Sequence, residues 1–315
     1  MSDNIKRIVK YYFPDSSACP NIRDYKWTKK GMFRLWSHGQ FVRNNDSYYE
    51  GIPKQKENKS LPSLGYCVFC GSTNNLTDEH IIPEFFGSGL YIKKSCCSTC
   101  QKITSRLESS IVSNMFDPIR KYLSLESKKG MLKKSNFKLD IGMETTNYET
   151  FPIDEYPVLL ALPRFDPASA ISNRPYDTDG FFDIIIYNFN FEKEKLNEKI
   201  KDFSTLHIDT LLFCQLLAKI AHSFAVFHLG FNGFKHTLQS FVLSDFINKF
   251  DGSYKSQYNY IGGLLPSGNE ERKCDMLHEL ELGQINWLDK SYHVVKIRLF
   301  SYLINLPSYY VIVGY

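Results

Sequence analysis

Two Cys-x-x-Cys pairs lie close together in the chain, and they constrain its fold more than any other feature. The first pair is Cys67 and Cys70, and the second is Cys97 and Cys100. Each pair presents two sulfur atoms from one tight backbone bend, and two such bends can hold Zn²⁺ in a tetrahedral site of four thiolates. Gly71 follows the first pair, which suits such a bend. The spacing predicts a structural zinc site, and the alternative is a set of reduced structural thiols without a metal.

The cysteines are clustered rather than spread along the chain. Five of the eight lie between residues 67 and 100, and pairing within an otherwise cysteine-poor chain favours metal binding over disulfides. Cys96 could replace Cys97 with a longer spacing, but the spacing of the first pair favours Cys97 as the ligand. The 26 residues between Cys70 and Cys97 exceed the roughly 15 to 20 of a plain zinc ribbon. We therefore expect additional structure between the two pairs.

The segment between the pairs predicts a β-hairpin that leads into a helix. Residues 77–83, TDEHIIP, run from polar to apolar and stop at a proline, which is typical of a short strand entering from a loop. Two glycines in FFGSGL supply a tight loop, and YIKKS can return as a second strand that leads to Cys97. After Cys100, apolar residues at helical spacing predict a helix that breaks near Pro118.

Glu79 and His80 are the candidate catalytic pair. Neighbours in a strand point to opposite sides, so the two side chains cannot duplicate one another. We expect His80 to face the first turn of the helix after Cys100, with a metal ion held between Glu79 and that turn. Phosphodiester hydrolysis needs a base that deprotonates water and a divalent cation that neutralises the phosphate and its leaving oxygen.

In combination, the motifs of residues 65–125 resemble the HNH endonuclease family, the ββα-metal nucleases, in the form whose hairpin is braced by two cysteine pairs. The resemblance rests on C-x-x-C-G, E-H-I-I-P, a glycine loop and a C-x-x-C that leads into a helix. It implies that His80 is the general base and that Glu79 binds a catalytic cation, Mg²⁺ or another such as Mn²⁺. Gln101 stands at the third signature position, where Asn or His is common, and the resemblance implies that its side-chain carbonyl oxygen is a further ligand of that cation. The asparagine that usually orients the base has no clear counterpart, and Ser95 or a main-chain carbonyl could serve instead.

Charge is distributed unevenly along the chain. Residues 1–140 hold 23 Lys and Arg against 13 Asp and Glu, whereas residues 141–315 hold 15 against 21. A basic half beside an acidic half predicts that the first half meets a polyanion such as DNA, with RNA not excluded; the alternative is solubilising surface charge. The candidate phosphate contacts, each of which could also be an ordinary exposed residue, are Lys93, Lys94, Lys102 and Arg106.

Shifts in composition and in the pattern of apolar residues along the chain predict four parts and an α+β fold class. They are a basic, aromatic-rich N-terminal segment (1–64), the zinc-braced ββα-metal module (65–127), a basic linker (128–140) and a larger mixed α+β domain (141–315). In the last part, YPVLLALP and GFFDIIIYNFNF predict buried strands, residues 203–230 a long buried helix, and residues 292–315 a hairpin. His222, on the long helix, is expected to be a hydrogen-bonded core histidine.

The sequence thus predicts a metal-dependent HNH endonuclease that hydrolyses DNA, with residues 141–315 as a possible surface for a protein partner or a second copy. The remainder of the chain, with YPVLLALPRFDP, LLAKIAHSFAV and the closing IRLF and YYVIVG, also resembles a recurrent bacterial HNH protein. That resemblance implies a place in anti-phage defence or a mobile element. The alternatives are a zinc-stabilised nucleic-acid-binding or adaptor module without catalysis, and a nuclease subunit active only with a partner. No apolar run reaches the roughly 18 residues of a membrane span, and no export signal is evident. We expect a soluble cytoplasmic protein.

Overall fold

The fold combines helices and strands, which confirms the predicted α+β class. Most of the predicted N-terminal segment and of the predicted basic linker lie outside the described residues. The computed structural model describes residues 41–43, 49–51, 60–87, 90–123, 125, 136–140, 148–153, 155–156, 158–165, 168, 170, 182–188, 210–244, 259–264, 277–287, 289–301 and 306–315.

The predicted hairpin and helix are present between and after the cysteine pairs. Strands β4 (Leu76–His80) and β5 (Tyr91–Cys97) pair antiparallel, with a short 3-10 turn, η2 (Glu84–Phe86), between them. β3 (Ser60–Leu61) pairs parallel with β5 along its other edge. Helix α2 (Ser98–Ile111) begins directly after β5. The second cysteine pair therefore spans the junction of strand and helix.

The helix after the second cysteine pair ends in steps. α2 passes into a π-helical turn, η3 (Val112–Phe116), and then into α3 (Asp117–Tyr122). Pro118 lies in the first turn of α3, where its missing N–H removes no helical hydrogen bond. At the predicted break near this proline the chain therefore stays helical, and a new α-helix, α3, begins.

The largest sheet has six strands in the order β1-β11-β12-β13-β10, with β2 also paired to β11. All of its pairings are antiparallel. β12 and β13 confirm the hairpin predicted near the end of the chain. The strands are β1 (Phe41–Arg43), β2 (Tyr49–Gly51), β10 (Ile261–Leu264), β11 (His278–Trp287), β12 (Lys290–Leu299) and β13 (Ser308–Gly314).

Two further antiparallel pairs lie outside these sheets. β8 (Leu159–Phe165) pairs with β9 (Phe182–Asn188), which confirms the two strands predicted in this region. β6 (Asn136–Asp140) pairs with β7 (Tyr148–Pro152). The predicted linker at 128–140 therefore ends in a strand.

Helix α6 (Thr210–Leu229) is the long buried helix that the sequence predicts. Gly230 follows it with φ of 81°, a left-handed conformation that glycine adopts without strain and that commonly ends helices. A short helix, α7 (Gln239–Val242), packs against α6. By length and composition Leu211–Leu229 could cross a membrane, with a mean hydropathy of 1.4, but 83% of the window that meets this test is buried inside the fold. α6 thus has the setting of a core helix in a soluble protein.

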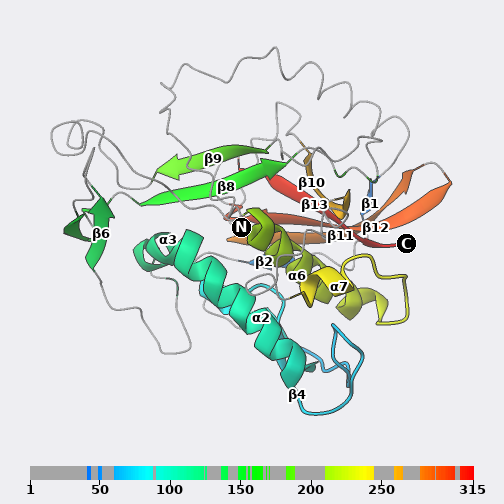
Figure 1. The fold of residues 1–315 in the computed structure, drawn as a ribbon. Coiled ribbons are helices and arrows are strands. Elements are labelled where there is room, and N and C mark those ends of the chain that lie inside the picture. Colours follow the sequence, from blue (N-terminus) through cyan, green and yellow to red (C-terminus); the bar gives the residue numbers. More distant parts are fainter. Residues whose placement is uncertain are drawn as a thin grey trace, which may run out of the picture.

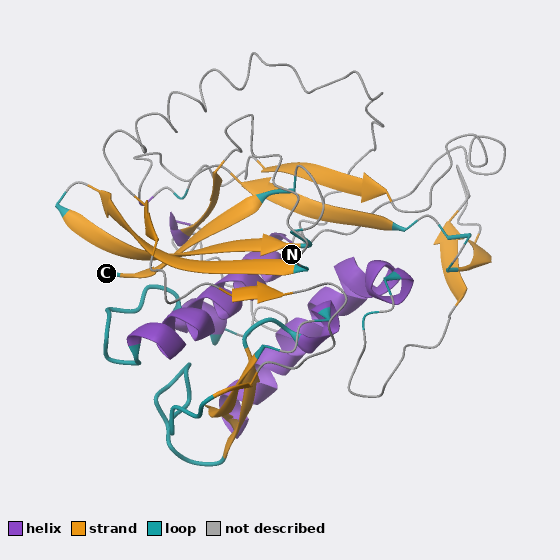
Figure 2. Cartoon of the chain, turned by 180° about the vertical axis from the view of Figure 1, so that it is seen from behind, coloured by secondary structure: helices purple, strands orange, loops and turns teal. Residues whose placement is uncertain are grey.

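α6 lies between the large sheet and the zinc module. It packs against β12 and β13 on one side and against α2 on the other, and Figures 1 and 2 show the helix pair beside the sheet with the β4 and β5 hairpin at the far end of α2. One continuous cluster of buried residues includes Phe69, Ile81 and Leu90 of the module together with Leu217 of α6 and Val295 of β12. The boundary predicted near residue 140 is therefore crossed by a shared core.

Candidate functional site

Four cysteine sulfurs converge between the two Cys-x-x-Cys turns, which we call the first knuckle (Cys67–Cys70) and the second knuckle (Cys97–Cys100). Each of the Sγ atoms of Cys67, Cys70, Cys97 and Cys100 lies within 4.8 Å of the other three. Four sulfurs at about 2.3 Å from a central Zn²⁺ would lie about 3.8 Å apart, and the Cys70 and Cys97 sulfurs are 3.6 Å apart. Thiol hydrogen bonds from Cys100 and Cys96 hold the pKa of Cys67 well below its usual range. The donor set fits a structural zinc ion.

The backbone of the first knuckle is closed by local hydrogen bonds. The Gly71 N–H donates to the Cys67 carbonyl at 2.8 Å, and the Cys67 N–H donates to the Ser72 carbonyl at 2.7 Å. Gly71 has φ of 72°, where a side chain would be strained, and an added Cβ would meet the Phe231 ring at 3.1 Å. The left-handed turn therefore favours glycine at this position, and the Phe231 ring leaves little room for a side chain.

Cys97, rather than Cys96, belongs to the four-sulfur cluster. Successive residues of a strand point to opposite faces, and these two cysteines are the last residues of β5. Cys96 is fully buried, and its thiol lies 3.6 Å from the Cys97 carbonyl oxygen. The structure therefore supports the choice that the two-residue spacing favours.

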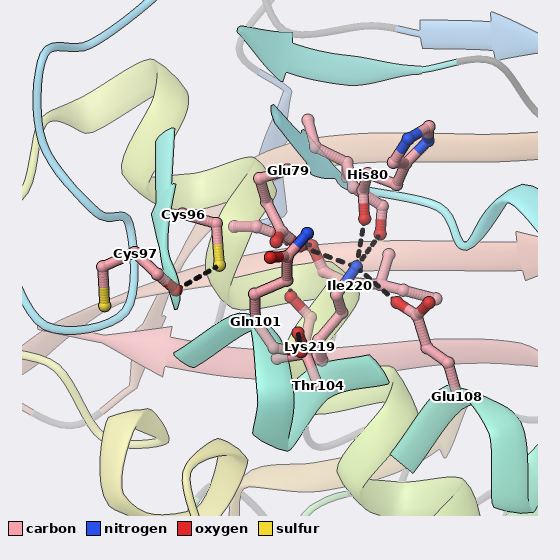
Figure 3. Close-up of polar contacts among 11 residues, drawn as sticks. Glu79, His80, Cys96, Cys97, Gln101, Thr104, Glu108, Lys219 and Ile220 are labelled. Carbon is pink, nitrogen blue, oxygen red and sulfur yellow. Dashed lines mark hydrogen bonds and ion pairs between the residues drawn. The ribbon is translucent and has the colours of Figure 1, made fainter. Parts of the chain in front are cut away.

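Glu79 and His80 point to opposite sides of β4, as their adjacency predicts (Figure 3). The Glu79 side chain is buried, whereas His80 is half-buried and its ring lies 5.5 Å from the ring of Tyr91. The expected orientation of the pair is wrong: Glu79, not His80, points toward α2. The physical reason is that this buried side supplies Glu79 with a cationic partner.

That partner is Lys219, which comes from α6. Its Nζ lies 2.7 Å from Glu79 Oε1 and 3.0 Å from Oε1 of Glu108 on α2. It also donates to the carbonyl oxygen of His80 and lies 3.4 Å from that of Ile81. Lys219 is fully buried, so the ammonium has exchanged water for two carboxylates and two carbonyls (Figure 3).

The electrostatics of this cluster favour a charged lysine. Burial alone would lower the pKa of Lys219, but the carboxylates of Glu79 and Glu108 outweigh it and raise the pKa above its usual value. A buried charge is tolerated when it is paired and its hydrogen bonds are satisfied. Burial raises the pKa of Glu79, while the Lys219 ammonium 2.7 Å away lowers it and so favours the carboxylate. The cluster therefore holds a cation supplied by the protein itself.

Gln101 lies in the first turn of α2, and its side chain points toward Glu79 (Figure 3). The main-chain carbonyl oxygen of Gln101 accepts a hydrogen bond from the Thr104 hydroxyl at 3.3 Å. The structure thus brings Glu79 and Gln101 to the same side of the hairpin. Because the Glu79 carboxylate is paired with the Lys219 ammonium, the residues as arranged do not fit a divalent cation there. The roles of Glu79 and Gln101 as ligands of a catalytic cation stay predictions.

The four candidate phosphate contacts are all exposed. Lys93 and Lys94 lie on β5, and the Lys94 N–H donates to Asp78 Oδ1 at 2.9 Å where the pairing of β4 and β5 is irregular. Lys102 and Arg106 are one helical turn apart on α2, so they share a face. Their exposure is compatible with nucleic-acid contact, which stays a prediction.

The C-terminal part also holds the first knuckle through hydrogen bonds to its backbone. The His222 Nε2 lies 3.0 Å from the Val68 carbonyl oxygen, and the Gln239 Nε2 donates to the Phe69 carbonyl at 2.5 Å. Burial lowers the pKa of His222 to about 4, so its ring is neutral at physiological pH. The prediction of a hydrogen-bonded core histidine is confirmed.

Lys219 and Glu108 are the residues that sequence reasoning missed. A signal for Lys219 exists, since it is the one Lys, Arg, Asp or Glu in the apolar run 210–229, and buried lysines are almost always paired. A signal for Glu108 is its helical spacing from Gln101, seven residues earlier, which places both on one face of α2. Nothing in the local sequence connects the two to Glu79.

No protein-family model, curated protein or solved structure matches this chain. The resemblance to HNH endonucleases therefore rests on sequence motifs, chiefly those of residues 65–125.

Proposed function

We propose that this protein is a phosphodiester hydrolase of the HNH type that acts on DNA, with His80 as its general base. The observation that carries the proposal is the place of His80: it is the last residue of β4, half-buried, in a hairpin whose two ends are tied together by the four-cysteine cluster. Its backbone carbonyl accepts a hydrogen bond from Lys219, and its ring packs against the ring of Tyr91. A base held by its strand, its neighbour and a buried cation is well oriented for proton transfer from water.

The proposal gives each group a limited task. Zn²⁺ held by the cysteines has a structural role, because a site of four thiolates leaves no open position for a substrate. His80 takes a proton from the attacking water, and the exposed Lys93, Lys94, Lys102 and Arg106 contact phosphates. A catalytic Mg²⁺ or Mn²⁺ is implied by the resemblance only. We assign it no role in the reaction, because the Glu79 carboxylate is already paired with the Lys219 ammonium.

A second candidate function is favoured by that same ion pair. If Glu79 serves only to pair with Lys219, the module could be a zinc-stabilised nucleic-acid-binding or adaptor module without catalysis. Such a module would bind DNA equally well with or without Mg²⁺ or Mn²⁺ and would leave it intact. A nuclease subunit that needs a protein partner, contacted through residues 141–315, would cleave only when that partner is added.

Incubation of supercoiled plasmid DNA with zinc-loaded protein tests the proposal. Reactions would contain no added metal, Mg²⁺ or Mn²⁺, and would compare the wild type with His80→Ala and, as a surface control, Lys290→Ala, which lies exposed on β12 and outside the hairpin of β4 and β5. In the reactions with Mg²⁺ or Mn²⁺ we expect nicked or linear product from the wild type and from the control. We expect none from His80→Ala, whose zinc content should be unchanged. Retained cleavage by a clean preparation of His80→Ala would refute the assignment.

A cytoplasmic location and a role in anti-phage defence are parts of the same proposal. The location is supported by a thiol-based site, since four reduced cysteines persist most readily in a reducing compartment. The defence role is supported by the sequence resemblance. Identification of the neighbouring genes is the observation that tests it.

A further inference from the structure

We infer that Lys219 is the resident cation of the hairpin, and that its ammonium keeps Glu79 and Glu108 from binding a divalent metal ion in the intact protein. The inference concerns the oxygen cluster between β4, α2 and α6. It holds whether or not His80 hydrolyses DNA.

The ligands around Lys219 are those that a hard metal ion prefers. Two carboxylates, from Glu79 and Glu108, and two main-chain carbonyls, from His80 and Ile81, converge on one point. Carboxylate and carbonyl oxygens are the typical ligands of Mg²⁺, Mn²⁺ and Ca²⁺. The chain has thus assembled an oxygen site in its interior and filled it with an ammonium group.

The distances belong to an ammonium rather than to a metal. Nζ lies 2.7 Å and 3.0 Å from the two carboxylate oxygens, which is the range of charge-assisted hydrogen bonds. Mg²⁺ would need oxygens at about 2.0 to 2.1 Å in octahedral geometry. A divalent ion could enter only if the Lys219 side chain left a place where it is fully buried, and the displaced ammonium would then lack its two carboxylates.

The tether gives the ammonium a lasting advantage over dissolved cations. Lys219 lies in the middle of a helix that is packed on the large sheet and on α2, so its charge is always present at the site. A free metal ion must instead lose water and translational freedom to compete. Removing the ammonium would leave the buried carboxylate of Glu79 and the partly exposed carboxylate of Glu108 facing two carbonyls, an arrangement that favours binding of another cation.

The test measures Mn²⁺ binding to zinc-loaded, full-length protein by isothermal titration calorimetry and by the electron paramagnetic resonance signal of free Mn²⁺. The wild type and Glu79→Gln are expected to bind Mn²⁺ identically, because Glu79 is not available to it. Lys219→Met, which keeps the approximate length of the side chain without its charge, is expected to bind one more Mn²⁺ per chain than the wild type, because the carboxylate and carbonyl oxygens are then free to bind it.

The control is the double variant Lys219→Met with Glu79→Gln, which is expected to lose the additional Mn²⁺. The inference is overturned if the wild type binds a Mn²⁺ ion that Glu79→Gln does not. It is also overturned if Lys219→Met retains its zinc and its fold but gains no Mn²⁺. Should Lys219→Met fail to fold, the comparison of the wild type with Glu79→Gln still decides. Loss of DNA cleavage in any of these proteins does not enter the result, so failure of the proposed hydrolase is a separate outcome.

Discussion

At the scale of single residues, Lys219 has the largest expected effect on stability. Its ammonium pairs with Glu79 and with Glu108, and its side chain is 1% exposed. Removing the buried ammonium leaves the buried Glu79 carboxylate without its partner, at a cost of about 3–5 kcal/mol, and removes a contact from Glu108, whose side chain is 23% exposed. We therefore expect Lys219→Ala to lower the free energy of unfolding by about that amount in urea denaturation.

The matched control for Lys219→Ala is Lys102→Ala, because Lys102 is exposed on α2. Exposed charges contribute little, and the control should change the free energy of unfolding by less than about 0.5 kcal/mol. If the two alanine variants were equally stable, the buried cluster would not be formed in solution.

His278 makes stability depend on pH. Its ring is fully buried at the start of β11. Nδ1 accepts a hydrogen bond from the Phe300 N–H at 3.2 Å, so Nε2 carries the proton and donates to the Phe86 carbonyl at 3.0 Å. Burial lowers the pKa of His278 from 6.5 to about 4. The neutral ring is therefore the form that the fold accepts.

We expect the contribution of His278 to be fully present above pH 6.5 and to be lost as the pH falls toward 4. The unfolded chain binds a proton in this range and the folded chain does not, so acid favours unfolding. The difference between the two pKa values corresponds to about 3 kcal/mol. Urea denaturation of the wild type and of His278→Gln between pH 7.5 and pH 4 measures it. A pH profile that is unchanged in the variant would contradict this account of His278.

At the scale of elements, the junction of β5 and α2 separates two adjacent thiols. Cys97 faces the sulfur cluster, and Cys96 is buried outside that cluster. We expect Cys96→Ser to retain one zinc ion per chain and Cys97→Ser to lose it or to bind it far more weakly. Zinc analysis after gel filtration measures both. Equal zinc content in the two variants would show that either thiol can complete the site.

The sequence predicts the order of these elements but not the side of β4 that meets α2. Spacing alone locates the four cysteines, the two strands and the start of the helix, because these depend on neighbours in the chain. The direction of Glu79 depends on Lys219, which lies 139 residues after His80. A strand of five residues with one buried side chain carries no local mark of which face a distant helix will cover.

At the scale of the whole molecule, the zinc module and the C-terminal part share one core. Composition and charge predict a boundary near residue 140, since linkers are recognised by exposed polar residues. Contacts across such a boundary leave no comparable local pattern. The shared core is made by apolar residues of α6 that face α2 on one side and the large sheet on the other. A helix that is apolar on nearly every side predicts burial but does not identify the elements that cover it.

Because the core is shared, we predict that removal of zinc destabilises α6 as well as the two knuckles. Lys219 and His222 of α6 bond to the backbone of the hairpin and of the first knuckle. Chelation of zinc should therefore lower amide hydrogen-exchange protection in α6 as well as in residues 65–100, while the pair β8 and β9 changes less. Loss of protection confined to residues 65–100 would mean that the module unfolds independently of the rest.

The central claim is that His80, held in place by this assembly, takes the proton from water during phosphodiester hydrolysis, and chemical rescue tests it most directly. In zinc-loaded His80→Gly the base is missing and cleavage of DNA should fall by about 10² to 10⁴-fold. Added imidazole can enter the space left by the ring, and we predict that it restores cleavage in proportion to its concentration while leaving the wild type unaffected. Cleavage by His80→Gly at the wild-type rate, or a folded, DNA-binding His80→Gly that imidazole does not rescue, would contradict the claim.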